Sequence, residues 1–254
     1  MKDTKNIQNI RNQIINISYE TKSAHLGSSL SCVEILYSIF KLSSDKKKIK
    51  NDIIFSKGHA AIAYYVTLQN FGYLKKKTIQ SYLQKKTNLW SHITHQKKDF
   101  FFKFSFGSLG YGPGIAAGLS LGYKNLRTSN NIFCIVSDGE LNEGSIWESL
   151  MFISHRRLNN ITILIDCNRW QSFGSTKDVI NLNPLGGKLK NFGFEIFSVN
   201  GHDINKITKS LKKKTNKPKI IICNTIKGKG LTRIQNTLES HYIPAKKTDI
   251  GKAK

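Results

Sequence analysis

The sequence predicts an α/β fold with a doubly wound, mostly parallel sheet and helices on both faces. From residue 132 onward, short apolar runs alternate with helical patterns, as in the strand–helix–strand units of parallel sheets. Polar residues such as Asp138 and Asn168 follow directly on two of these runs, at the strand ends where such sheets bind ligands. Hydrophobic residues make up 39% of the 254 residues, which is enough for a large packed core.

The first part of the chain is predicted to be mainly helical. Isoleucines between positions 7 and 17 mostly recur at helical spacing, so the chain begins with an amphipathic helix. Ser31 and Glu34 then have the spacing of a capping box ahead of an apolar run. After this second helix we expect a short strand at 51–56, its turn at 57–59, and a helix of small residues at 60–71.

A Lys-rich polar region follows to about Gln96, and glycines then cluster in FGSLGYGPG, where Pro113 suits the first residue of a helix. A further helix is expected to begin at Ser145, with Glu148 as its capping-box partner. The remaining predicted elements are strands at 132–137, 161–166, 194–199 and 219–225, and helices after Pro184 and Asp203. No linker, repeat or compositional shift interrupts the series. Residues 1–254 are therefore expected to form a single domain, with a less regular tail from about 227.

Forty Lys and Arg residues against sixteen Asp and Glu give the chain a formal charge of +24 at pH 7. Such a charge is compatible with a polyanionic partner. However, the basic residues are spread along the chain in short runs, such as 46–48, 75–77 and 212–214. We therefore interpret the charge as a solvated surface and expect no specific nucleic-acid binding.

The four cysteines, at positions 32, 134, 167 and 223, have no C-x-x-C spacing, and three lie in apolar, strand-like runs. This pattern is typical of buried thiols in a reducing compartment, rather than of a disulfide framework or a zinc site. The first twenty residues lack the apolar core of a signal peptide, and no apolar run approaches the ~18 residues of a membrane span. We expect a soluble, cytoplasmic protein that does not associate with membranes.

The stretch from 132 to 168 carries the strongest chemical signal. Asp138-Gly139 follows its first predicted strand and Asn168 its second, and hard oxygen ligands at neighbouring strand ends suit Mg²⁺, or Ca²⁺, holding a diphosphate. Gly139 would let the backbone approach a phosphate closely. The alternative is an Asp-Gly turn and an unrelated strand-end asparagine, which a lone Asp-Gly pair would favour.

Glycines and histidines add weaker signals. Gly107, Gly110, Gly112 and Gly114 precede a helix N-terminus, where free amides and the helix dipole attract anions, although a glycine-rich loop is more often a turn. Four histidines occupy loops or the starts of elements. A lone histidine in such a place is more often exposed, or buried with its hydrogen bonds satisfied, than functional. They are His25, His59, His92 and His241.

Residues 137–168, SDGELNEGSIWESLMFISHRRLNNITILIDCN, closely resemble the cofactor motif of the transketolase family, and the resemblance extends over essentially the whole chain. The family motif usually begins Gly-Asp-Gly, whereas this chain has Ser137 at the first position. The resemblance implies that thiamine diphosphate is bound together with Mg²⁺. It implies metal ligands at Asp138, Asn168 and the Trp170 carbonyl, cofactor contacts at Gly107, Leu109, Gly139 and Asn168, and an acid near a cofactor-linked interface at Glu143.

The same resemblance implies roles for the four histidines. Transketolases have a histidine at each matching place, and there neutral and protonated imidazoles bind sugar hydroxyls and transfer protons. At His92 the family usually reads Gly-His-Pro, whereas this chain reads Ser-His-Ile, and His95 is a nearby competitor that we disfavour. The sequence KGKG at 227–230 matches the family loop that leads toward His241; a basic turn is an equally supported interpretation.

The resemblance covers only the first of the three domains of single-chain transketolases. In the family, the glutamate that activates the cofactor belongs to the second, pyrimidine-binding domain. The resemblance thus implies the N-terminal subunit of a split transketolase. Such an enzyme is a heterotetramer, completed by a subunit with the pyrimidine-binding domain, that moves a two-carbon ketol unit from a ketose or its phosphate to an aldose. The alternatives are a subunit of a 2-oxo acid dehydrogenase or deoxyxylulose-phosphate synthase, or a non-catalytic basic protein on this fold. His25, His59 and His241 argue against the first two.

Overall fold

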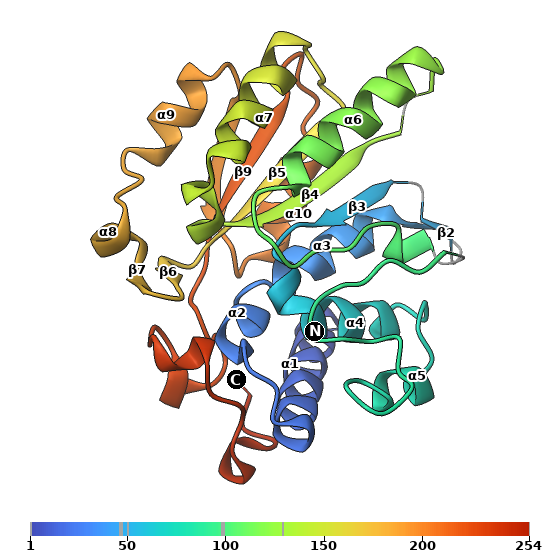
Figure 1. Ribbon diagram of the computed structural model, residues 1–254, viewed down its shortest axis with the longest axis vertical. Helices are drawn as coiled ribbons and strands as arrows, with labels where there is room; N and C mark the ends of the chain where they lie inside the picture. Colours follow the sequence, from blue (N-terminus) through green and yellow to red (C-terminus); the bar gives the residue numbers. More distant parts are fainter. Residues whose placement is uncertain (1, 46–47, 50, 98–99, 129, 254) are drawn as a thin grey trace.

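A computed structural model describes residues 2–45, 48–49, 51–97, 100–128 and 130–253 (Figure 1). Its central sheet has five strands in the order β3-β4-β5-β9-β8, and all four pairings are parallel. Since parallel strands share one direction, the carboxyl ends of all five lie at one edge, which we call the carboxyl edge. The strands are β3 (Asp52–Phe55), β4 (Ile132–Ser137), β5 (Ile161–Cys167), β8 (Glu195–Asn200) and β9 (Lys219–Asn224).

Helices cover both faces of this sheet, as Figure 1 shows. On one face lie α6 (Gly112–Asn125), α7 (Gly144–His155) and α9 (Leu185–Asn191), and on the other α3 (Val33–Ser43) and α10 (Ile204–Lys212). Right-handed crossovers account for this division. The chain runs along the sheet from β3 to β8 over one face and returns to β9 over the other. The predicted doubly wound α/β fold is confirmed.

The amino-terminal helices and the last segment of the chain meet beyond the carboxyl edge. Figure 1 shows α1 (Lys2–Thr21), α2 (Leu26–Ser31) and α4 (Ala61–Asn70) there, with the red C-terminal segment beside α2. The short elements are α5 (Lys76–Gln80), α8 (Thr176–Val179), the hairpins β1 (Ser44–Asp45) with β2 (Lys48–Ile49) and β6 (Trp170–Gln171) with β7 (Gly174–Ser175), and the 3-10 turns η1 (Gly58–Ala60), η2 (Phe100–Phe102), η3 (Gly139–Asn142), η4 (Thr232–Ile234), η5 (Glu239–His241) and η6 (Lys247–Asp249).

The core lies between the sheet and its helices. All six residues of β4 are buried, as are the first six of β5, because helices cover both faces of these central strands. Cys32, Cys134 and Cys223 are buried free thiols, and Cys167 is a partly buried one. Among the described residues, no helix has the length and apolarity needed to cross a membrane.

The capping box predicted for Ser31 and Glu34 is wrong. Ser31 is the last residue of α2, and its hydroxyl donates to the carboxylate of Asp166 at 2.6 Å. Glu34 accepts two hydrogen bonds of 2.7 Å from the Arg11 guanidinium instead of capping a helix. Both side chains form hydrogen bonds with residues distant in the sequence, and the local sequence pattern does not reveal such partners.

The capping box predicted for the next helix, from Ser145 to Glu148, is also wrong, although its predicted start differs from the observed one by a single residue. The α7 helix begins at Gly144, and the hydroxyl of Ser145 donates to the carbonyl of Gly110 at 3.2 Å rather than capping the helix. Pro113 is the second residue of α6, not the first. The Lys-rich region to Gln96 contains the short helix α5, and the β6–β7 hairpin was not predicted at all.

Candidate functional site

The carboxyl edge gathers polar side chains from distant parts of the chain. His59 follows β3, Asp138 follows β4, Asn168 follows β5 and Lys227 follows β9. The η5 turn reaches the same edge because the backbone N–H of His25 donates to the carbonyl of His241 at 2.9 Å. The fold thus brings the predicted site residues His59, Asp138 and Asn168 together, with Lys227 beside them, where open α/β sheets bind their ligands.

Asp138 and Asn168 lie side by side in the floor of this edge, 1% and 2% exposed. The Asp138 carboxylate accepts the backbone N–H groups of Gly139 at 3.0 Å and Arg169 at 2.5 Å. Burial, and then the negative charge of Asp166, raises the pKa of Asp138 to about 7. Within the described part of the chain this carboxylate forms no ion pair, so a cation would supply the missing compensation.

Two contacts fix the orientation of the Asn168 amide. Its Nδ2 group donates to the Asp166 carboxylate at 3.3 Å, and its Oδ1 atom accepts the Trp170 N–H at 3.0 Å. A flipped amide would set its oxygen against a carboxylate and its NH₂ group against an N–H donor. The second lone pair of Oδ1 remains a suitable hard ligand for Mg²⁺ or Ca²⁺.

A fully buried ion pair between Lys57 and Asp166 lies behind these ligands. Asp166 also accepts the hydroxyls of Ser31 and Thr225, while Lys57 donates to the Ser28 carbonyl at 3.1 Å. Burial acts to raise the pKa of Asp166, but Lys57 and these hydrogen bonds hold it below its usual value. We did not predict this pair. The available signal was an aspartate inside the apolar run ITILIDC, because a charge in a buried strand requires a partner.

The four predicted histidines form one cluster centred on His25. The ring centroid of His25 lies 4.8 Å from that of His241, 5.5 Å from that of His59 and 5.8 Å from that of His92. By contrast, the Nδ1 atom of His95 lies 3.0 Å and 2.9 Å from the carbonyl oxygens of residues 102 and 103. His92 is thus a member of the cluster, whereas the ring of His95 faces backbone carbonyls instead. His25 also has a left-handed φ of 62°, a strained conformation of the kind found at functional sites.

The clustered imidazoles are neutral at pH 7. Burial, followed by His92 and Lys227, lowers the pKa of His25 to about 4, and burial, followed by Lys227 and His25, lowers that of His241 to about 3. Burial and the Lys57 ammonium lower the pKa of His59 well below its usual value, and burial lowers that of His92. The expected mixture of neutral and protonated imidazoles is not what this arrangement produces.

Lys227 also lies at the carboxyl edge, and the sequence did not reveal its environment. Its side chain is completely buried, and its Nζ atom has no hydrogen-bond partner among the described residues. Burial, followed by the nearby Lys57 ammonium, lowers the pKa of Lys227 to about 8. The Nδ1 atom of His241 is likewise buried without a partner in the described structure. Since buried polar groups normally form hydrogen bonds, both atoms fit a site that binds a polar, anionic molecule.

The glycine-rich loop forms one side of the edge. Gly107 is exposed and faces His92: a Cβ atom there would lie 3.9 Å from the ring. Leu109 is half-buried. Gly110 has a φ of +93°, and a Cβ atom there would lie 2.8 Å from the Cβ of Glu143, so only glycine fits. Glu143 is exposed at the start of α7, where its side chain makes no capping hydrogen bond.

The β6–β7 hairpin packs against the acidic turn. A Cβ atom at Gly139 would lie 2.7 Å from the Cβ of Gln171, so hairpin packing gives this glycine a role besides the predicted approach to a phosphate. Trp170 is half-buried and begins this hairpin. No group of three or more His, Cys, Asp or Glu side chains able to hold a metal lies among the described residues, so a metal site at Asp138 would need amide and carbonyl oxygens as well.

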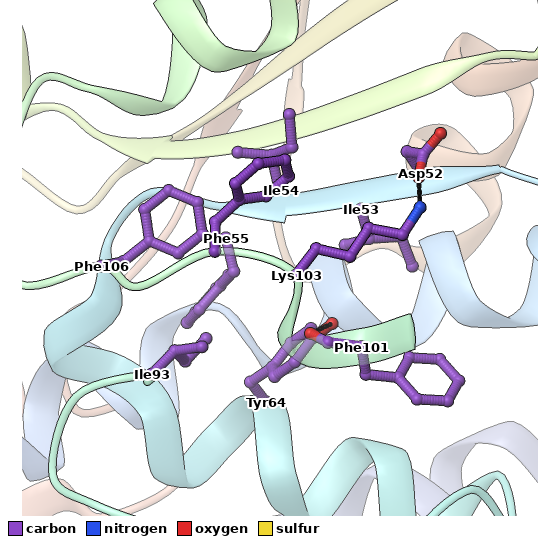
Figure 2. Close-up of a pocket in the computed structure, with 10 residues that line it drawn as sticks. Asp52, Ile53, Ile54, Phe55, Tyr64, Ile93, Phe101, Lys103 and Phe106 are labelled. Carbon is purple, nitrogen blue, oxygen red and sulfur yellow. Dashed lines mark hydrogen bonds and ion pairs between the residues drawn. The ribbon is translucent and has the colours of Figure 1, made fainter. Parts of the chain in front are cut away.

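The segment that carries His92 is anchored on β3. Figure 2 shows the packing gap between them, lined mainly by apolar side chains, with an ion pair of 2.5 Å between Lys103 and Asp52 at its rim. A cavity of about 10 Å³ has room for at most one water molecule, so this gap is packing rather than a ligand site.

Comparisons with known proteins show the family of the chain. The family model for the transketolase thiamine diphosphate binding domain matches residues 2–254. An apulose-4-phosphate transketolase subunit of Actinobacillus succinogenes is 33% identical over 97% of this chain and 92% of its own length. The 6-deoxy-6-sulfo-D-fructose transketolase subunit SqwG of Clostridium sp. is 33% identical over 86% of this chain and 82% of its own length.

Solved structures show the same fold. A mutant transketolase from Pichia stipitis superposes with a TM-score of 0.91 at 24% identity, covering 99% of this chain and 40% of that one. The transketolase from Leishmania mexicana gives a TM-score of 0.88 at 23% identity, covering 97% and 40%. The chain thus spans about 40% of the length of these two transketolases. It belongs to the transketolase family and corresponds to the family's thiamine-diphosphate-binding domain.

Proposed function

We propose that this chain is the diphosphate-binding subunit of a two-subunit transketolase that uses thiamine diphosphate and Mg²⁺. The complete enzyme would transfer a two-carbon ketol unit from a ketose or ketose phosphate to an aldose. The observation that carries the proposal is the convergence, at one sheet edge, of four neutral histidines, the buried carboxylate of Asp138 and the buried ammonium of Lys227. Two relatives matched over most of their length bear the name transketolase subunit, which supports the two-chain form.

The metal would be held by Asp138, Asn168 and the backbone carbonyl of Trp170. A buried carboxylate whose pKa is raised to about 7 gains most from a nearby dication, because the cation favours its ionised form. The fixed Asn168 amide offers an oxygen from the next strand end. Such hard oxygen donors suit Mg²⁺, and Ca²⁺ as a second choice.

The residues present also fit thiamine diphosphate. The unpartnered Lys227 ammonium would face its diphosphate, while Gly107, Leu109 and Gly139 would line the cofactor together with Asn168. When bound, the cofactor supplies the carbon nucleophile that carries the two-carbon unit between sugars. This chain contributes the binding and orientation of the diphosphate end.

The histidine cluster would bind the sugar. Neutral imidazoles can donate through one ring nitrogen and accept through the other, so they can hold hydroxyl groups and move a proton between them. The Nδ1 atom of His241 has no hydrogen-bond partner among the described residues and can make such a contact, and the ring of His25 neighbours the other three. We assign His25, His59, His92 and His241 to donor binding and proton transfer.

The same edge would face the second subunit, which supplies the pyrimidine-binding domain and the activating acid. Exposed aromatic side chains lie around it, including Tyr111 (59% exposed), Phe173 (81%) and Tyr242 (54%), and exposed apolar groups of this size often mark protein interfaces. Glu143 and the loop at 107–114 would belong to the interface. We propose a heterotetramer with two copies of each chain. The four free thiols support a reducing, cytoplasmic location.

The proposal is tested by mixing the purified chain with a pyrimidine-domain subunit from the same genome. Light scattering should give the mass of two copies of each chain, and ketol transfer should require both subunits, thiamine diphosphate and Mg²⁺. Turnover of a ketose by the isolated 254-residue chain would contradict the two-subunit proposal. A well-formed complex that transfers no ketol group from any of a panel of ketoses and their phosphates would contradict the assigned activity.

A further inference from the structure

Glu140 is a completely buried carboxylate without a counter-ion. Its side chain is 0% exposed, and among the described residues it forms no ion pair. In the described part of the chain, the groups that hydrogen-bond to its side chain are neutral donors. Its Oε1 atom accepts the Gly110 N–H at 2.8 Å and the Ser56 hydroxyl, and its Oε2 atom accepts the Ser137 N–H at 3.2 Å. A buried charge is costly, so an arrangement that keeps one here needs a reason.

The second link of this arrangement runs through Ser56. A hydroxyl donates one hydrogen, and that of Ser56 is directed at Glu140, so its lone pairs are left for a donor. The N–H of Gly112 fills this role at 3.0 Å. Glu140 therefore holds the backbone at Gly110 directly and the backbone at Gly112 through one intermediate hydroxyl.

The held segment ends in the first residues of α6, and apart from Glu140 and Ser56 the Ser145 hydroxyl, which donates to the Gly110 carbonyl at 3.2 Å, also contacts it. Glycine is the residue with the greatest backbone freedom, and four glycines lie between positions 107 and 114. The two held glycines also allow the close approach: a Cβ atom at Gly112 would lie 2.4 Å from the Cβ of Ser56, and the φ of Gly110 is +93°. The glycines allow the backbone many conformations, and the hydrogen bonds of the Glu140 carboxylate stabilise one of them.

We propose that Glu140 is a positioning residue, which sets the conformation of the loop at 107–114 and through it the wall of the cofactor site. The identity of the ligand rests on the proposed function, whereas the hold on the loop does not. Glu140 lies two residues beyond Asp138. One short turn therefore carries both a proposed metal ligand and the carboxylate that holds the loop at 107–114. Loss of the Glu140 carboxylate should weaken cofactor binding without removing any group that contacts the cofactor.

The test compares four variants by amide hydrogen exchange of the isolated chain. In Glu140→Ala, exchange at Gly110 and Gly112 should accelerate at least tenfold, because hydrogen bonds to a charged acceptor are stronger than those between neutral groups. In Ser56→Ala only Gly112 should accelerate. Glu140→Gln should keep Gly110 slow, since its single oxygen can still face this donor. Glu148→Ala, which removes an exposed carboxylate from α7, is the matched control and should change neither amide.

Exchange at Ile163 in the centre of β5 serves as the reference for global stability. Unchanged exchange at Gly110 in Glu140→Ala, or equal acceleration at Gly110 and Ile163, would overturn the inference. If Glu140→Ala does not fold, the selective loss at Gly112 in Ser56→Ala decides, and uniform exchange in that variant would overturn it equally.

Cofactor binding is then measured by calorimetry on the assembled complex at saturating Mg²⁺. Glu140→Ala should weaken thiamine diphosphate binding about tenfold, and Glu140→Gln should restore most of it. Wild-type complex that binds no thiamine diphosphate would contradict the proposed function while leaving the exchange result intact. If Glu140→Ala accelerates exchange in the loop but leaves the affinity for thiamine diphosphate unchanged, the proposed effect on the cofactor site is overturned.

Discussion

The buried ion pair between Lys57 and Asp166 allows the sharpest test of what holds the site together. Substitution Lys57→Met keeps the length and apolar stem of the side chain but removes its ammonium. Both partners are 0% exposed, so the Asp166 carboxylate would be left in the core without a cation. Three neutral donors would remain, from Ser31, Thr225 and the Asn168 amide.

The expected loss can be estimated from the burial of the pair. Breaking a buried pair by removing one partner typically costs about 3–5 kcal/mol, and the three remaining donors favour the lower end, about 3 kcal/mol. For a domain of this size that corresponds to a decrease in Tm of about 6–12 °C. The matched control is Lys41→Met. Its ion pair with Asp3 has side chains that are 46% and 34% exposed, so its removal should cost about 0–1 kcal/mol.

Urea denaturation followed by circular dichroism at pH 8 measures both variants. The pH dependence gives a second readout. In Lys57→Met the isolated carboxylate has a raised pKa, so the native state binds a proton that the unfolded state does not, and the loss of stability should shrink as the pH falls toward 5. A loss for Lys57→Met within 1 kcal/mol of that for Lys41→Met, or one independent of pH, would refute the reasoning.

Three further predictions concern the metal, the histidines and the charge. Asp138→Ala should abolish Mg²⁺-dependent retention of thiamine diphosphate by the complex while preserving the circular dichroism spectrum, because the residue lies at a strand end; unchanged binding in a calorimeter would contradict the metal assignment. The free energy of unfolding should decrease as the pH falls from 6.5 toward 4, because His25 and His241 stay neutral in the native state while unfolded imidazoles bind protons. The single Asp138 carboxylate, with its pKa raised to about 7, opposes only part of this loss, so urea midpoints that are equal at pH 7 and pH 5 would count against the lowered pKa values of the two histidines. Binding to random DNA should be weak and fall steeply with added salt, and tight, sequence-selective binding at ~150 mM salt would show instead that the basic surface recognises nucleic acid.

The elements with the strongest local signal were predicted well. The strand at 132–137 has the predicted bounds, and the predicted strands at 161–166, 194–199 and 219–225 differ from the observed ones by at most one residue at either end. Buried parallel strands are continuous apolar runs that end in polar turns. The residues of each run and its flanking turns are therefore enough to predict where the strand begins and ends. Asp138 and Asn168 were placed at strand ends for the same reason, since each directly follows such a run.

The predictions that failed concern side chains whose partners are distant in the sequence. Ser31 and Ser145 have the local pattern of helix caps, yet one donates to Asp166 and the other to Gly110. Lys57 and Glu140 look like ordinary turn residues in the sequence, and only their complete burial reveals that one neutralises Asp166 and the other holds the glycine-rich loop. A local sequence pattern predicts helices, strands and turns. It does not predict which distant residue will contact a given side chain in the folded protein.

The sequence by itself determined the strands, the fold class and the polar residues that end the strands, because burial on both faces imposes a local composition on each element. The tertiary structure decided the order β3-β4-β5-β9-β8, which inserts the last strand between two earlier ones. It also decided that His25, His59, His92 and His241 meet while His95 does not. Crossovers and packing set these distances, and burial then keeps the imidazoles neutral, a property that no single segment of the chain possesses alone.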